Sequence, residues 1–210
     1  FNGKFIIDGE EKEESLFSLI KQTSKDNPEN IVSAYKDNVA FIKGPKVEQF
    51  SPKYAEKPSV YQNSSFESVI SIKAETHNFP TTVEPFSGAA TGSGGEIRDR
   101  LAGGQGSIPL AGTAVYMTPY PRFENSMFGF HERKWLYQKP IDILIKASNG
   151  ASDFGNKFGQ PLISGSLLTF EHKEDKKLLG FDKVIMLAGG VGYGKLEHSK
   201  KKKIENGDLI

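Results

Sequence analysis

One stretch of this 210-residue sequence constrains the fold more than any other: an alternating segment from Val69 leads into a glycine-rich segment that ends at Gly106. Successive side chains of a β-strand point to opposite faces. One face of such a strand would carry the apolar residues Ile70, Ile72 and Ala74. The other face would carry three titratable residues, Lys73, Glu75 and His77. We therefore expect the apolar face to join the core and the titratable face to form a site.

The glycine-rich segment predicts a phosphate-binding loop. Seven of the nineteen positions from 88 to 106 are glycine, and glycine exposes backbone N–H groups that can wrap an oxyanion such as phosphate. Glu96, Arg98 and Asp99 lie within it. A guanidinium can bind phosphate oxygens, and a carboxylate can hold the magnesium that accompanies a nucleotide. The alternative is a solvated strand face followed by a flexible loop.

Composition excludes several other classes of function. The formal net charge is +1, which argues against a nucleic-acid-binding surface. The chain has no cysteine, which rules out disulfides and thiolate metal sites and fits a cytoplasmic protein. No apolar run approaches the roughly 20 residues that span a bilayer, so we expect no membrane partner. Because Phe1 is not an initiator methionine, we expect the chain to be part of something longer.

The remaining pattern predicts one α+β domain in which strands outnumber helices. We expect strands at 5–7, 39–42, 107–117, 162–170 and 184–188, and one or two helical turns at 140–147 that end at Asn149-Gly150. A helix at 15–25, capped by Ser15, would pack on the core through Leu16, Leu19 and Ile20. Residues 46–66 would be an irregular excursion and residues 171–177 a charged turn.

A second glycine-rich segment resembles a nucleotide-binding motif without matching it. Residues 189–195, GGVGYGK, approach the phosphate-loop pattern G-x-x-x-x-G-K-[ST], but Leu196 stands where the magnesium-binding hydroxyl should be. The residues that follow have no apolar stripe for the helix that should receive the phosphate. We therefore interpret this segment as a turn.

The segment KAETHNFPTTVEPFSGAATGSGGEIRD, residues 73–99, resembles the signature of phosphoribosylformylglycinamidine synthase, the amidotransferase of purine biosynthesis, in its large single-chain form. SAYKDN (33–38), FGNKFGQP (154–161) and VIMLAGGVG (184–192) resemble the same family in the same order. The resemblance implies a half-barrel mixed sheet flanked by helices, as in the N-terminal domain of aminoimidazole ribonucleotide synthetase. It implies a domain over residues 1–206, with 207–210 beginning the next domain.

The resemblance also implies a reaction and a set of roles. In this family ATP phosphorylates the formamide oxygen of formylglycinamide ribonucleotide, and ammonia from a glutaminase domain then displaces phosphate to give the amidine. The implied cofactors are ATP and Mg²⁺, with Mg²⁺ on Glu75 and Asp99 and catalysis by His77 and Arg98. The implied substrate contacts are Thr76, His77, Asn78 and Arg98. The implied ATP-binding residues are Lys73, Gly88, Ala89, Ala90, Thr91, Gly92, Ser93, Gly94 and Gly95.

The chain departs from the family in ways that affect its activity. Many members read H-N-H-P where this chain has Phe79 in place of the second histidine, and a phenyl ring cannot transfer a proton. The glutaminase domain and an upstream histidine motif are absent, so we predict that the chain alone does not catalyse the full reaction. The implied partners are the remaining synthetase and glutaminase domains. Domains of this type complete a barrel by pairing, so we also expect self-association.

Two other functions are compatible with the residues. One is a related ATP-dependent kinase or ligase, such as those acting on thiamine phosphate or selenide, although the match outside the glycine-rich segment argues against it. The other is a non-catalytic assembly domain of the same fold. Such a domain would have no reason to keep its lysine, carboxylates, histidine and arginine together, and it would not bind magnesium-ATP.

Overall fold

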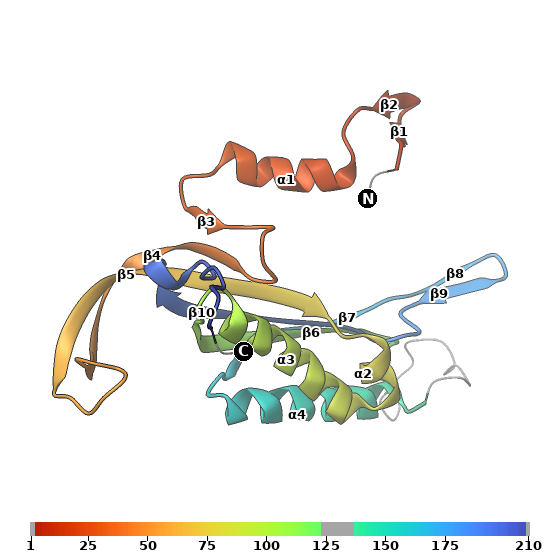
Figure 1. Cartoon of the computed structure of the whole chain (residues 1–210). Coiled ribbons are helices and arrows are strands. Elements are labelled where there is room, and N and C mark those ends of the chain that lie inside the picture. Colours follow the sequence, from red (N-terminus) through yellow and green to blue (C-terminus); the bar gives the residue numbers. More distant parts are fainter. Residues whose placement is uncertain (1–2, 123–136, 209–210) are drawn as a thin grey trace.

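The computed structural model describes residues 3–122 and 137–208. Its main feature is a six-stranded sheet in the order β3-β4-β5-β10-β6-β7, antiparallel except for the parallel pair β6 and β7 (Figure 1). Its strands are β3 (Ile31–Ser33), β4 (Ala40–Pro52), β5 (Tyr61–Thr76), β10 (Ile185–Lys195), β6 (Ile108–Thr118) and β7 (Leu162–Thr169). The predicted α+β fold with a mixed sheet is confirmed, as are the strands expected at 107–117 and 162–170.

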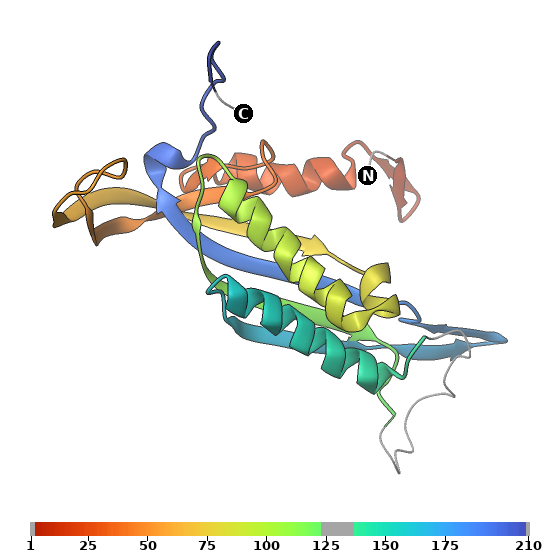
Figure 2. The same cartoon turned by 60° about the horizontal axis from the view of Figure 1, so that its bottom comes forward.

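Two long helices, α3 (Pro85–Ala102) and α4 (Pro140–Lys157), lie side by side on one face of the sheet (Figure 2). Each begins with a proline, whose fixed φ suits a helix and whose missing N–H has no helical partner at that position. The short helix α2 (Phe79–Val83) precedes α3. The main core cluster lies between the helix pair and the sheet and contains Ala89, Ala114, Tyr116, Ala147, Ala151, Met186 and Ala188.

Strand β5 turns its titratable face toward the helices and leaves its apolar face uncovered. The expectation that Ile70, Ile72 and Ala74 join the core is therefore wrong, and Ile72 is 39% exposed. The helix layer covers only one face of the sheet, and that face carries Lys73 and Glu75. Apolar residues of neighbouring strands extend the uncovered surface, which we call the open sheet face. Its groove of about 320 Å³ is lined by residues that include Ile72, Ala74, Ala111, Ile163 and Val191.

The predicted glycine-rich loop is also wrong, because residues 85–102 form helix α3. Glycine is a poor helix former, by up to about 1 kcal/mol relative to alanine, so local preference alone favours a loop. Tertiary packing reverses that preference. Gly88 lies against the backbone of Pro80 and Thr81 in α2, where a side chain would not fit.

Packing also overrides four other local expectations. Residues 46–66 belong mostly to the long hairpin of β4 and β5, which reaches beyond the rest of the sheet (Figure 1). Helix α4 does not stop at Asn149-Gly150 but continues to Lys157, and Gly150 lies against the carbonyl oxygen of Phe86. Residues 189–195 form part of the central strand β10 instead of a turn, which leaves no phosphate loop there. Residues 171–177 form most of the hairpin β8 (Glu171–Glu174) and β9 (Lys177–Gly180).

The N-terminal part stands apart from the core. Strands β1 (Phe5–Ile7) and β2 (Glu10–Lys12) form a hairpin, and α1 (Leu16–Asp26) follows with Ser15 as its N-cap, as predicted. The expected packing of α1 on the core is wrong, because none of its residues is buried and Leu19 is half exposed. Figure 1 shows α1 on the side of the sheet away from α3 and α4. Among the described residues, no helix is both long and apolar enough to cross a membrane.

Candidate functional site

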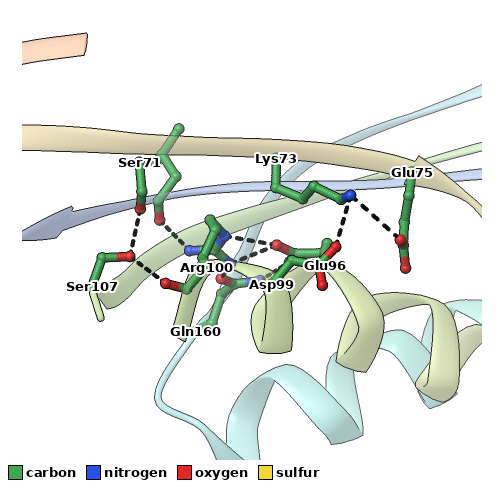
Figure 3. A network of polar contacts seen from close by, with 9 residues as sticks. Ser71, Lys73, Glu75, Glu96, Asp99, Arg100, Ser107 and Gln160 are labelled. Atoms are coloured by element: carbon green, nitrogen blue, oxygen red, sulfur yellow. Dashed lines mark hydrogen bonds and ion pairs between the residues drawn. The ribbon is translucent and has the colours of Figure 1, made fainter. Parts of the chain in front are cut away.

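Lys73 on β5 and Asp99 on α3 form the centre of the candidate site. The Nζ atom of Lys73 lies 2.7 Å from Oδ2 of Asp99 and 3.8 Å from Oε2 of Glu75 (Figure 3). The three side chains are between 16% and 30% exposed, so their charges are partly withdrawn from water. Charges interact more strongly in such a setting than on an open surface. One ammonium group therefore holds two carboxylates at a place that a ligand can reach.

Glycines on one stripe of α3 allow the helix to lie against the polar face of β5. A Cβ atom on Gly92 would lie 2.8 Å from Cβ of His77, and one on Gly95 would overlap the carboxylate of Glu75. Residues three and four positions apart share one face of a helix, so Asp99 continues the same stripe and meets the next polar side chain of the strand. The glycine-rich sequence thus positions the site by removing side chains from this contact.

A buried polar network lies directly beside these charges. Arg100 donates from Nε and Nη2 to Oε2 of Glu96, at 2.8 and 2.6 Å, and from Nη1 to the carbonyl oxygen of Val191 at 2.8 Å (Figure 3). Its Nη2 also donates to Oε1 of Gln160, whose amide in turn donates to Glu96. All three polar side chains are at most 1% exposed. The network connects α3 to the central strand and to the chain that follows α4.

Sequence reasoning missed this network. Room for it exists only because β10 carries glycine opposite α3: a Cβ on Gly190 would lie 2.6 Å from Nη2 of Arg100, and one on Gly192 would lie 3.1 Å from its Nη1. Two features of the sequence could have indicated it. The four-residue spacing of Glu96 and Arg100 puts an acid and a base on one helix face. Gly190 and Gly192 alternate in a strand, which often marks a close approach of another group.

Burial raises the pKa of the Glu96 carboxyl above its usual range. The hydrogen bond from Gln160 and the charge of Arg100 act in the opposite direction, while the nearby charge of Glu75 raises the pKa further. Desolvation is the dominant cause. Removing the carboxylate from water costs more free energy than the hydrogen bond from Gln160 and the charge of Arg100 restore.

His77 and Asn78 follow the site along the chain, and each forms a hydrogen bond with the backbone of Met186. The backbone N–H of His77 donates to the carbonyl oxygen of Met186 at 2.9 Å, and Oδ1 of Asn78 accepts from the N–H of Met186 at 3.1 Å. The Nδ1 atom of His77 is buried and has no hydrogen-bond partner among the described residues. Because Nδ1 is buried, a ligand in solution can approach the imidazole only at Nε2.

Two of the predicted site residues do not join the site. Thr76 follows Glu75 on β5 and therefore points to the opposite face of the sheet, where it is exposed. Arg98 is exposed on α3 and forms no hydrogen bond or ion pair with any residue in the described part of the chain. The structure thus brings together Lys73, Glu75 and Asp99, with His77 next along the same face.

The predicted phosphate cradle of residues 88–95 is not present as expected. These residues lie inside α3, where backbone N–H groups are used in helical hydrogen bonds, so they cannot wrap an oxyanion. Most of them are buried. Of the predicted ATP-binding residues, only Lys73 has a charged group at the site.

The SAYKDN segment borders a cavity of about 530 Å³ beside β5, whose lining includes Lys73 and Ala74. Burial alone would raise the pKa of Asp37, but hydrogen bonds from the N–H groups of Asn38 and Gly104 and from Lys201 lower it overall. Tyr35 has a φ of 59°, which a non-glycine residue rarely adopts. The volume is within the range of small-molecule sites.

The donor atoms at the centre of the site fit a Mg²⁺ ion that takes most of its ligands from elsewhere. The described residues contain no group of three or more histidine, cysteine, aspartate or glutamate side chains placed to hold a metal. Glu75 and Asp99 offer two carboxylates instead. Mg²⁺ commonly uses one or two carboxylates and takes its other ligands from water and substrate phosphates. The pair therefore fits a magnesium ion that arrives with a nucleotide.

No family model matches the sequence. Phosphoribosylformylglycinamidine synthase of Dictyostelium discoideum is 39% identical over 215 residues, which take in 100% of this chain and 16% of that protein. This chain is therefore homologous along its whole length to one segment of that synthase, and the resemblance inferred from the motifs is confirmed.

The solved structures include proteins named for the same family. PurL of Thermotoga maritima complexed with ATP is 27% identical, with a TM-score of 0.40 over 61% of this chain and 17% of that chain. PurLQS of Thermotoga maritima gives a TM-score of 0.57 over 97% of this chain and 28% of that chain, at 14% identity. The second match shows that the two chains share a fold.

Proposed function

We propose that this chain is a domain of a phosphoribosylformylglycinamidine synthase and that it supplies the metal- and phosphate-binding side chains of the synthetase site. The observation that carries the proposal is the convergence of Lys73, Glu75 and Asp99 at one place, in a chain that is homologous throughout to that synthase. The reaction would use ATP and glutamine to convert formylglycinamide ribonucleotide into formylglycinamidine ribonucleotide.

The geometry supports a division of roles among these residues. Glu75 and Asp99 would hold Mg²⁺, which when bound neutralises phosphate charge and orients the transferred group. Lys73 would bind phosphate oxygens with its ammonium group. Its ammonium lies within 3.8 Å of both carboxylates. These side chains would thus bind the metal–nucleotide complex as one unit.

His77 is the residue best placed for proton transfer, because it lies next to Glu75 on the same face and an imidazole can both accept and donate a proton. Asn78 would contact the substrate mainly through its amide nitrogen, since its oxygen already accepts a hydrogen bond from Met186. The structure gives no support for Thr76, and Arg98 would have to meet the substrate from the exposed side of α3.

Other parts of a larger protein would complete the activity. The chain spans only 16% of the length of the curated relative, so the remaining synthetase domains and the glutaminase are proposed partners. We expect the isolated chain to produce no amidine from glutamine. We propose the cytoplasm as the location, as for other enzymes of soluble nucleotide metabolites.

The open sheet face would be the contact with one of these partners or with a second copy of the chain. The exposed Ile72, Ile163 and Val191 suit such a contact, because contiguous exposed apolar surface commonly marks an interaction site. This large apolar face also favours the second candidate, a non-catalytic assembly domain.

Calorimetric titration of magnesium-ATP distinguishes the two candidates. We expect the parent chain to bind, and the double variant Glu75→Ala, Asp99→Ala to lose binding at least tenfold. Asp153→Ala, at an exposed carboxylate on α4 paired with Lys157, is the matched control and should bind like the parent. Equal binding by the parent and the double variant would refute the site, and absence of binding by the parent would favour the assembly domain.

A further inference from the structure

Lys73 occupies the place that a cation would take between Glu75 and Asp99. Its ammonium lies 2.7 Å from one carboxylate and 3.8 Å from the other, and all three side chains are partly buried. Two carboxylates that share a partly buried site repel each other unless a positive charge lies near both. In this structure the protein supplies that charge itself, from a side chain on the strand that also carries Glu75.

Neighbouring cations cannot easily replace Lys73. Arg100 is fully buried and is already bonded to Glu96, Gln160 and the carbonyl oxygen of Val191. Arg98 is exposed on α3 and has no ion pair with any residue that the structure describes. The negative charge of the two carboxylates is therefore balanced mainly by the Lys73 ammonium.

Building on the proposed function, we propose that Lys73 makes the site select a divalent cation that arrives with a phosphate ligand over the bare cation. A bare cation would have to break the 2.7 Å ion pair and would leave the ammonium beside a second positive charge. Phosphate oxygens would give the displaced ammonium a new partner. Metal and phosphate therefore bind better together than either does alone.

In this proposal the metal takes the place of the Lys73 ammonium between the carboxylates, and the ammonium moves to the phosphate; we call this the exchange. It predicts that one substitution at Lys73 has opposite effects on two kinds of metal binding. Lys73→Met keeps most of the length of the side chain and removes its charge, so bare Mn²⁺ should bind about tenfold more tightly, within the usual range of coupling between ligands. In the same variant the affinity for Mn²⁺ in the presence of a non-hydrolysable ATP analogue should no longer exceed the affinity for bare Mn²⁺, because the phosphate oxygens have no ammonium to bind. A purely structural role for Lys73 would instead weaken both kinds of binding.

The test is to count bound Mn²⁺ by electron paramagnetic resonance, with and without the analogue, in the parent, Lys73→Met and Lys73→Gln. Lys157→Met is the matched control, because Lys157 also pairs with a carboxylate but lies on the exposed side of α4. It should behave like the parent in both titrations. Circular dichroism would establish that each variant is folded, and two neutral variants guard against misfolding of one.

The outcomes distinguish failure of the exchange from failure of the proposed function. Tighter binding of bare Mn²⁺ by a folded neutral variant supports the exchange, and equal or weaker binding overturns it; neither result depends on the nucleotide. Failure of the parent to bind Mn²⁺ with the analogue would count against the proposed function instead. If Lys157→Met also tightened binding of bare Mn²⁺, a general effect of net charge would replace the exchange.

Discussion

Gly95 on α3 and Glu75 on β5 lie so close together that a Cβ atom on the glycine would occupy the position of the glutamate carboxylate. The same carboxylate lies 3.8 Å from the ammonium of Lys73. The missing side chain at position 95 therefore decides where a charged group of the site can lie. This contact explains why position 95 carries a glycine although glycine is unfavourable inside a helix.

Replacing Gly95 should impair the site more than the fold. Gly95→Ala would push the carboxylate of Glu75 away from Lys73, but a glutamate tip can rotate, and alanine gains about 1 kcal/mol in helix propensity. We expect the free energy of unfolding to stay within about 1 kcal/mol of the parent value and the affinity for magnesium-ATP to fall about tenfold. Urea denaturation and calorimetry measure the two quantities.

Gly88→Ala is the matched control for that substitution. A Cβ atom there would lie 2.5 Å from the carbonyl group of Pro80, and backbone cannot rotate away as a side chain can. We expect a loss of about 1–3 kcal/mol in the free energy of unfolding. If Gly95→Ala destabilised the protein as much as Gly88→Ala, the role assigned to Gly95 would be incorrect.

Removing the buried guanidinium should destabilise the protein strongly. Arg100→Met leaves the carboxylate of Glu96 buried without its ion-pair partner, which costs about 3–5 kcal/mol in comparable cases. The double variant Glu96→Met, Arg100→Met should recover much of that loss, because it leaves no unpaired charge. Urea denaturation of the single and double variants gives the comparison. A loss below about 1 kcal/mol for Arg100→Met would contradict the account of this network.

Glu96 should make the protein less stable as the pH rises. Burial raises its pKa in the folded state, so above the ordinary carboxyl range the folded protein holds a proton that the unfolded chain has released. This stabilising contribution is complete below the unfolded pKa and is lost as the pH rises through the folded pKa. Because Glu96→Gln cannot titrate, the parent should lose stability relative to this variant over that window.

The measurement for this prediction is the difference in unfolding free energy between the parent and Glu96→Gln, taken from denaturation at a series of pH values from about 4 upward. Groups common to both proteins cancel in the difference. A difference that stays constant with pH would mean that Arg100 and Gln160 fully offset the desolvation of the carboxylate.

The open sheet face should mediate self-association of the isolated chain. Ile72→Glu puts a charge in the centre of this apolar surface, where a partner would have to bury it. We expect the parent to associate and the variant to remain monomeric in light scattering at the same concentration. Leu19→Glu on α1 is the control, because it charges an apolar residue of similar exposure outside the sheet. A monomeric parent at high concentration would refute this prediction.

Local sequence was sufficient for some parts of the molecule. The polar cap Ser15, the small apolar run of β6 and the alternation in β5 each depend on neighbours in the chain, and the structure agrees with them. Alternation alone put Lys73 and Glu75 on one face. The dense signature of residues 73–99 predicted the similarity to the synthase that the comparison of whole sequences then found, because such a match is read from the sequence alone.

Tertiary structure decided which face of β5 is covered and whether the glycines form a helix. Alternation shows which residues share a face, but α3 and α4 determine which face is buried, and they lie on the polar one. Glycine carries no side-chain signal and disfavours a helix locally, so close tertiary contacts, with Glu75 and His77 on β5 and with Pro80 in α2, explain α3. The pairing of Arg100 with Val191 joins residues 91 positions apart, a distance over which no local pattern predicts contact.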